Sequence, residues 1–194
     1  MIRLSSTDGF KVSLEKALTD IDPNWPNYDG LLISGSHKPE DVPLEHALHE
    51  LKKARESGIP TLGICFGLHL GAIEFARNVL GLTEAHSEEL APNAPVKVVT
   101  KLPGMRSGIK PVGRAQRMEN HWHMYRLNPT LLHAFTSAFR LECTKDSDGE
   151  VVVEEMLHTE HSFYQFVQYH PEYGSTPDKP HPVLVAFLNA CKKK

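Results

Sequence analysis

A chain of 194 residues is long enough to bury a full hydrophobic core, and its apolar and charged fractions are those of a globular protein. The formal net charge of -3 at pH 7 gives no electrostatic attraction to nucleic acid or to an anionic membrane. Three cysteines do not make a disulfide framework at this length, and the sequence shows neither a bilayer-spanning apolar segment nor the form of a signal peptide. We therefore expect a single domain over residues 1–194, located in the cytoplasm.

The N-terminus predicts a first strand that is either short or missing. Only residues 1–4 precede the polar segment 5–9. If the strand is missing, the edge of the next strand would be exposed, and such edges are usually covered by a loop or by another chain. A homodimer or a contact with a partner protein would supply that cover.

Strands and helices alternate after this segment. Residues 31–33 are a short apolar run typical of a buried strand, and residues 43–57 repeat apolar side chains at the spacing of an amphipathic helix. Residues 61–64 predict another strand, followed by a helix after Cys65. This series favours an α/β fold with a mainly parallel sheet and helices on both faces. Four later segments suit an antiparallel extension: residues 96–100, 139–144, 151–156 and 163–169.

A cysteine lies where a strand turns sharply into a helix, in the run Gly63-Ile64-Cys65-Phe66-Gly67. The two glycines supply the backbone freedom and the close approach that a tight corner needs. The sulfur would lie at a helix N-terminus, where unpaired N–H groups and the helix dipole favour the thiolate over the thiol. A free cysteine is more often a small apolar filler, which is our interpretation of Cys143 and Cys191. The corner distinguishes Cys65 as a candidate nucleophile.

A candidate base for this nucleophile follows in the sequence His170-Pro171-Glu172, at the end of a strand-like run. Proline breaks the strand, so that both polar side chains project from a rigid turn. His170 would take the thiol proton, and Glu172 would hold the imidazole in the correct tautomer. A solvated turn would explain this tripeptide if it stood alone. Because Cys65 and His170 both follow predicted strands, at the sheet edge where active groups gather, we predict a Cys-His-Glu triad.

Five segments add a family resemblance: YDGLLISG at residues 28–35, GIPTLGIC at 58–65, AIEFARNVLGL at 72–82, MENHWHMYRLNP at 118–129 and QYHPE at 168–172. With the triad pattern they resemble the class I glutamine amidotransferases, and more closely the glutaminase domain of CTP synthase. The resemblance covers most of the chain and implies a flavodoxin-like fold, although a family member normally opens with a full apolar strand and a helix.

The resemblance implies hydrolysis of a carboxamide through a thioester. Cys65 would attack the amide carbon, His170 would protonate the leaving ammonia, and water would then release the acid. The backbone N–H groups of Phe66 and of Gly35 or Ser36 would form the oxyanion hole. In that loop the family usually has Gly-Gly-Phe-Gly, where this chain has Ser34-Gly35-Ser36-His37.

Substrate recognition departs from the family pattern. CTP synthase-like domains carry a glutamine four residues after the cysteine, and an acidic residue farther on that meets the substrate ammonium. The matching residues here are His69 and Glu89. Trp122 stands at the place of the arginine that grips the α-carboxylate of glutamine, and an indole cannot replace a bidentate charged clamp without loss. Either another arginine supplies the charge (Arg106, Arg114, Arg117 or Arg126), or the substrate is not free glutamine.

His121 and His123 alternate onto one face of a predicted strand, which is also a pattern for metal ligands. The His-x-His pattern of the family explains the pair without a metal. We therefore expect no metal and no cofactor, and we assign both histidines to the substrate pocket.

Three hypotheses follow. The chain is a glutaminase module that sends ammonia to a separate synthase partner, or a stand-alone amidase of a γ-glutamyl or other non-glutamine compound, or a catalytically weak binding or regulatory subunit. The intact triad argues against the third, the lost arginines favour the second, and the overall resemblance favours the first. We expect amidotransferase-like hydrolysis with altered recognition.

Overall fold

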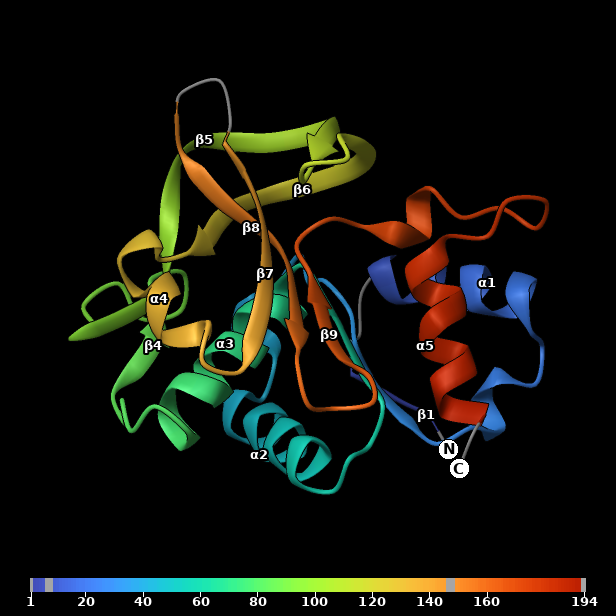
Figure 1. Cartoon of the computed structure of the whole chain (residues 1–194), viewed down its shortest axis with the longest axis horizontal. Helices are drawn as coiled ribbons and strands as arrows, with labels where there is room; N and C mark the ends of the chain where they lie inside the picture. The colour runs from blue at the N-terminus through green and yellow to red at the C-terminus, as the bar shows by residue number, and fades with distance from the viewer. Residues whose placement is uncertain (1, 6–8, 146–148, 193–194) are drawn as a thin grey trace.

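The computed structural model describes residues 2–5, 9–145 and 149–192. Its main sheet has the strand order β1-β2-β3-β9-β8-β7 (Figure 1). The first four strands of this order run parallel to one another, whereas β8 and β7 are antiparallel. The bounds are β1 Ile2–Ser5, β2 Gly30–Ile33, β3 Thr61–Ile64, β9 Tyr164–Val167, β8 Val151–His158 and β7 Phe139–Lys145.

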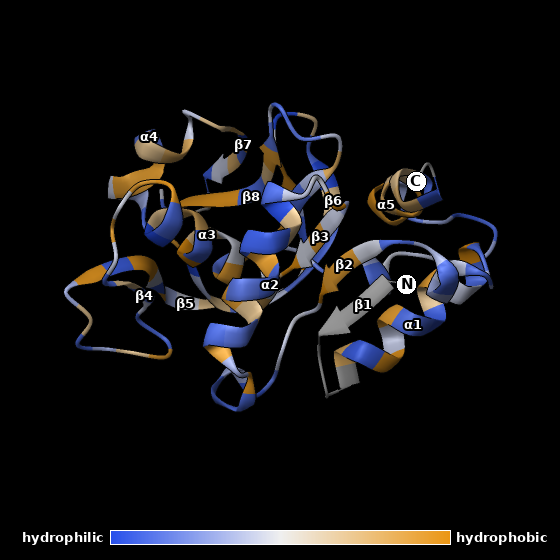
Figure 2. Cartoon of the chain, turned by 90° about the horizontal axis from the view of Figure 1, so that it is seen from below, coloured by the Kyte–Doolittle hydropathy of each residue, from blue (hydrophilic) through white to orange (hydrophobic). Residues whose placement is uncertain are grey.

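Helices cover both faces of the parallel strands. Apolar residues of α2 and α3 form one core cluster with β2 and β9, and apolar residues of α1 and α5 form a second cluster with β2 and β3. In Figure 2 the strands β2 and β8 are mainly hydrophobic, as expected of strands that are covered on both faces. The helices are α1 Gly9–Ile21, α2 Leu44–Glu56, α3 Phe66–Asn78, the short α4 Leu132–Phe135 and α5 Pro182–Lys192; the single 3₁₀ turns are η1 Trp25–Asn27, η2 Pro39–Asp41, η3 Pro129–Leu131 and η4 Pro171–Tyr173.

A second sheet is built from β4 Ala85–Ser87, β5 Val96–Val112 and β6 Arg117–Leu127. β5 and β6 pair antiparallel in a long ribbon, which Figure 1 shows arching beside β8. The alternation along β6 buries Glu119, His121 and His123 and turns Met118 and Trp122 outward. The ribbon thereby presents a polar inner face to the end of the parallel strands.

Of the two alternatives for the first strand, the structure has the short one: β1 pairs with β2 over four residues and α1 follows it. β2 is therefore not an edge strand, which removes the reason for expecting a homodimer. Ser6, Thr7 and Asp8 of the polar segment lie outside the described residues. Two other sequence expectations need correction. Residues 163–169 contain β9, which lies parallel to β3 in the centre of the sheet and is not part of an antiparallel extension. Residues 96–100 belong to the second sheet.

The predicted flavodoxin-like α/β fold is confirmed by the mainly parallel sheet with helices on both faces. The reason for the misassigned β9 is that a short apolar run carries no signal of strand direction, which is decided by its partners. In the described part of the chain no helix is long and apolar enough to cross a membrane.

Candidate active site

Two neighbouring parallel strands bring the predicted nucleophile and base to one edge of the sheet. β3 and β9 pair in register from Thr61 to Ile64, Cys65 follows β3, and His170 follows β9 three residues after its end. The N–H of Cys65 donates to the carbonyl of Val167 at 2.7 Å, which extends the pairing to the corner itself. Residues 105 positions apart in the chain thus meet because their strands are adjacent.

The strained backbone conformation of the corner between β3 and α3 lies at the cysteine itself. Cys65 has φ 53° and ψ -103°, a conformation that non-glycine residues rarely adopt. From the sequence we assigned the backbone freedom of the corner to Gly63 and Gly67. In the structure these two glycines allow close packing instead. A Cβ on Gly67 would lie 2.5 Å from the carbonyl oxygen of Ile33, and one on Gly63 would lie 2.3 Å from the ring of Phe166.

His170 is held by a buried carboxylate. Its Nδ1 donates to Glu172 Oε1 at 2.7 Å, and both side chains are fully buried. Burial lowers the pKa of His170, but the Cys65 sulfur and the Glu172 carboxylate outweigh burial and raise it to about 10. Nε2 has no hydrogen-bond partner among the described residues, so the sulfur acts on it through charge rather than through a well-formed hydrogen bond. The ring therefore carries its proton at neutral pH.

Gly35 lies between the two candidate reacting side chains. A Cβ at this position would be 2.8 Å from His170 Cε1 and 3.5 Å from Cys65 Cβ, so only glycine leaves the imidazole in place. Phe66 is the first residue of α3, and its N–H therefore has no acceptor within the helix. The neighbouring Ser36 accepts from the N–H of Lys38 through its hydroxyl. Gly35 thus lies beside Cys65 and Phe66 follows Cys65 in the chain, and the role of these residues and of Ser36 as oxyanion donors remains a prediction.

Gln168 is a contact residue that the sequence reasoning did not single out. Its Nε2 lies 3.8 Å from the Cys65 sulfur, and its Oε1 lies 3.1 Å from His69 Nε2. The other ring nitrogen of His69 is 3.7 Å from Glu89 Oε2. Since alternate residues of an extended segment share a face, the spacing of Gln168 and His170 was the available signal. The structure brings His69 and Glu89 together behind the nucleophile.

Phe10 is a second residue that the sequence did not indicate. Its ring stacks on His170 with centroids 4.4 Å apart and on His37 with centroids 4.1 Å apart. This contact joins residues from opposite ends of the chain, and no local pattern predicts it. Phe10 fixes the plane of the candidate base from the side of α1.

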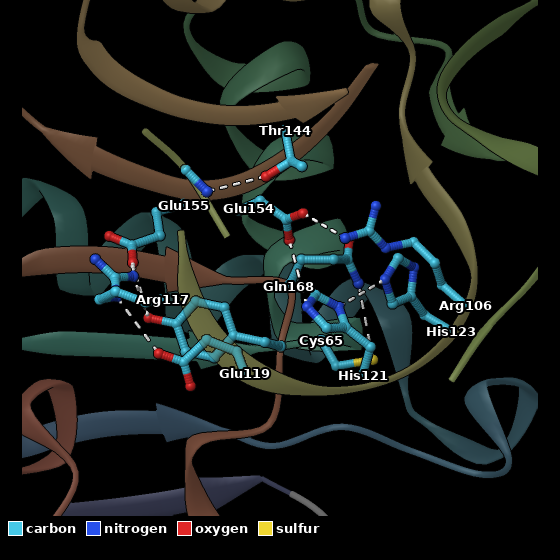
Figure 3. Close-up of polar contacts among 12 residues, drawn as sticks. Cys65, Arg106, Arg117, Glu119, His121, His123, Thr144, Glu154, Glu155 and Gln168 are labelled. Carbon is cyan, nitrogen blue, oxygen red and sulfur yellow. Dashed lines mark hydrogen bonds and ion pairs between the residues drawn. The ribbon is translucent and has the colours of Figure 1, made fainter. Parts of the chain in front are cut away.

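The inner face of the ribbon adds a buried polar chain next to Cys65 (Figure 3). His121 Nδ1 lies 3.2 Å from His123 Nε2, so these two nitrogens face each other instead of a shared ion. Burial and the nearby Arg106 lower the pKa of His121 to about 3, while burial raises the pKa of Glu154 to about 7 despite Arg106. The 3.9 Å contact of His121 with Glu154 is therefore not an ion pair at neutral pH.

Comparison with known proteins places the chain in a family. The profile of the family described as glutamine amidotransferase class-I matches residues 2–190. The chain belongs to the class I glutamine amidotransferase family. Among its relatives, a CTP synthase of Aeropyrum pernix is 32% identical over 212 residues, and one of Thermomicrobium roseum is 34% identical over 195 residues. These matches cover 98% and 90% of this chain but only 38% and 35% of the two synthases, so the chain spans little more than a third of their length.

Two solved structures share the fold of this amidotransferase domain. The glutaminase domain of the Trypanosoma brucei CTP synthase, solved with bound acivicin, has a TM-score of 0.84 at 20% identity and covers 100% of this chain and 94% of its own. A GMP synthase subunit of Thermoplasma acidophilum has a TM-score of 0.64 at 17% identity, covering 98% of this chain and 93% of its own. At these identities the likeness establishes the fold.

None of the four candidate arginines of the amidotransferase domain takes the place of the family arginine that binds the α-carboxylate of glutamine. Arg106 is committed to the buried Glu154 at 2.8 Å, Arg117 to Glu155 and Glu119, and Arg126 to Glu150 and the Val151 carbonyl. Figure 3 shows the Arg117 cluster set apart from Cys65. Arg114 lies exposed in the turn that joins β5 to β6. The suggestion that one of them takes over the clamp has no support in these contacts.

Two cavities of the amidotransferase domain adjoin at His37. One of about 530 Å³ is lined by Glu89 and His86, on the side of the His69 contact. The other, of about 470 Å³, is lined by His170, Trp122, Phe10 and Tyr173. The carbonyl oxygen of Trp122 lies 3.8 Å from the Cys65 sulfur, so its backbone contacts the nucleophile while its side chain lines the second cavity.

Proposed function

We propose that this chain is a cysteine amidase that hydrolyses the carboxamide of glutamine or of a glutamine-like compound. The observation that carries the proposal is the buried Cys65–His170–Glu172 arrangement at the ends of β3 and β9. Membership of the class I glutamine amidotransferases supports an amide as the substrate class. The triad roles and the oxyanion donors remain part of the proposal.

The reaction begins with the proton on His170 and the negative charge on the sulfur. Cys65 attacks the carbonyl carbon, and the oxygen gains charge next to the N–H groups of Phe66 and Gly35. His170 then passes its proton to the leaving nitrogen as the C–N bond breaks. Water attacks the thioester, gives its proton back to the imidazole and releases the acid. Glu172 keeps the ring oriented throughout.

The test is amide hydrolysis by the native chain and by Cys65→Ala, with Cys143→Ala as the matched control. Cys143 is an exposed cysteine on β7, outside the site. We expect ammonia release from glutamine or amine release from γ-substituted glutamines, abolished by Cys65→Ala and retained by Cys143→Ala. A glutamine-mimicking electrophile should label Cys65. No labelling and no turnover of any amide would favour a binding or regulatory role instead.

A second candidate is a glutaminase that delivers ammonia to a separate synthase. The observation that favours it is that the matching CTP synthases carry this region as about a third of a longer chain. On this proposal, glutamine turnover rises when a synthase partner is added. Fast turnover of a substituted amide by the isolated chain would argue against this candidate.

A further inference from the structure

His170, which protonates the leaving nitrogen in the proposed reaction, is part of the wall of the 470 Å³ cavity. On that mechanism the cavity lies on the side of the bond from which the amine departs. A substituent on that nitrogen would then extend into this space. Ammonia needs no such room, whereas cavities of roughly 300 to 1,000 Å³ are the size that holds a small organic ligand.

The walls of this cavity are mainly aromatic. Phe10 stacks on His170, and the ring of Tyr173 lies beside both, with centroids 6.1 Å from Phe10 and 5.7 Å from His170. Trp122 also lines the cavity, and Trp122 and Tyr173 are 54% and 50% exposed. Asn120 adds an amide, His37 and His121 add imidazoles, and His170 adds its protonated ring. Among the described lining residues no Lys, Arg, Asp or Glu is present. Large exposed rings lose little conformational freedom on binding and stack on flat apolar groups. This lining suits a neutral aromatic substituent.

The other side of the nucleophile differs in character. The cavity of about 530 Å³ includes two carboxylates, Glu40 and Glu89, together with His86. Glu89 is the residue that the family resemblance assigns to the substrate ammonium. The acyl half of a glutamine-like substrate therefore fits this side. The two cavities adjoin at His37, so the bond that is cleaved would lie between them.

We infer that the substrate is a secondary amide whose amine half carries an apolar aromatic group, bound between Phe10, Trp122 and Tyr173. This inference rests on the proposed amide hydrolysis and names its substrate class. Cys65 forms the thioester as the C–N bond breaks, the electron pair stays on nitrogen, and His170 supplies the proton that completes the free amine. Water then regenerates the thiolate and returns a proton to His170, giving one acid and one arylalkylamine.

The first test measures binding of the amine alone, which does not depend on the acyl half. Calorimetry compares phenethylamine with ethylamine on the native chain, on Trp122→Ala and on Met118→Ala. Met118 is exposed on the same strand but outside the cavity. We expect phenethylamine to bind at least about tenfold tighter than ethylamine, and Trp122→Ala alone to remove most of that difference. Equal binding of the two amines would overturn the inference.

The second test compares hydrolysis of glutamine with that of three γ-glutamyl amides, formed with phenethylamine, ethylamine and γ-aminobutyrate. We expect the highest kcat/KM for the phenethylamide, and a fall in its preference over the ethylamide in Trp122→Ala but not in Met118→Ala. Faster Cys65-dependent turnover of glutamine or of the anionic γ-aminobutyrate amide would overturn the inference and leave the proposed function intact. Absence of Cys65-dependent turnover for the whole series would instead contradict the proposed function.

Discussion

At the scale of single residues, the site depends on two side chains that hold the proton of His170. The Cys65 sulfur and the Glu172 carboxylate both favour the charged imidazole, against the effect of complete burial. A proton that is retained to about pH 10 is available for the leaving group at any physiological pH. The same pair makes the ring a poor free base, which suits the proton-donor role that we propose for His170.

Glu172→Gln should lower the pKa of His170, because it removes the negative charge 2.7 Å from Nδ1. An NMR titration of the imidazole measures this, and the rate of Cys65 alkylation at neutral pH should fall along with it. Glu119→Gln is a matched control, since Glu119 also faces a buried histidine, His181, at 3.0 Å. An unchanged His170 pKa in Glu172→Gln would contradict the assigned role.

The raised pKa also affects stability. The folded state holds the His170 proton more tightly than the unfolded state, so this contribution is complete below about pH 6.5 and is lost as the pH rises through about 10. The free energy of unfolding of the native chain should therefore fall over this range. In Glu172→Gln the pKa of His170 is raised less, so this variant has less of the pH-dependent stabilisation to lose. The difference in free energy of unfolding between the native chain and the variant should therefore narrow as the pH approaches 10.

Gly35→Ala should reduce activity more than stability. The added methyl group would lie 2.8 Å from His170 Cε1 and displaces the ring from the sulfur. A displacement of about 1 Å costs roughly a hundredfold in rate. The alkylation rate of Cys65 and the turnover of the best amide measure the effect. Gly104→Ala is the control, because its Cβ meets nothing within 4 Å.

At the scale of elements, α3 is fixed to α2 by a buried ion pair. Arg55 donates to both carboxylate oxygens of Glu74, which is fully buried on the helix that begins at the nucleophile. Glu74 raises the pKa of Arg55 beyond its ordinary value, so the guanidinium stays charged. The position of α3, and with it of the corner, depends on this contact.

Arg55→Met should destabilise the fold by about 3 kcal/mol, since it removes the cationic partner of the fully buried Glu74 and leaves only the 3.3 Å hydrogen bond from Asn78. The double variant Arg55→Met with Glu74→Met should recover most of this loss. Lys16→Met is the surface control: its pair with Asp20 is exposed, and its loss should cost less than about 1 kcal/mol. Chemical unfolding measures all three, and a double variant as unstable as the single one would contradict the account.

The elements also show where the sequence reasoning succeeded. The helix at 43–57 was predictable because its apolar residues repeat at 3.6-residue spacing, and α2 buries Ala47, Leu48 and Leu51 accordingly. The corner at Cys65 was predictable from its glycines. The direction of β9 was not predictable, because a run of four residues, three of them buried, gives the same pattern in either direction. Strand direction depends on pairing with β3.

At the scale of the whole molecule, the site gathers side chains from both ends of the chain and from the second sheet. The predicted triad could be read locally, since each part has its own motif. Phe10 and Gln168 could not be given roles in this way, because their contacts join segments about 160 and 100 positions apart. The wide cavity beside Trp122 likewise follows from the path of the ribbon, which no single motif encodes.

The unusual backbone conformation of Cys65 has a cost in stability. A conformation of this kind costs about 1 to 3 kcal/mol in any residue with a Cβ, and glycine alone avoids it. Cys65→Gly should therefore unfold at higher denaturant than Cys65→Ala, by about 1 kcal/mol after the entropic cost of glycine. Equal midpoints would show that the corner stores no such strain. If the difference is found, the conformation that the fold imposes on its candidate nucleophile costs the native chain part of its stability.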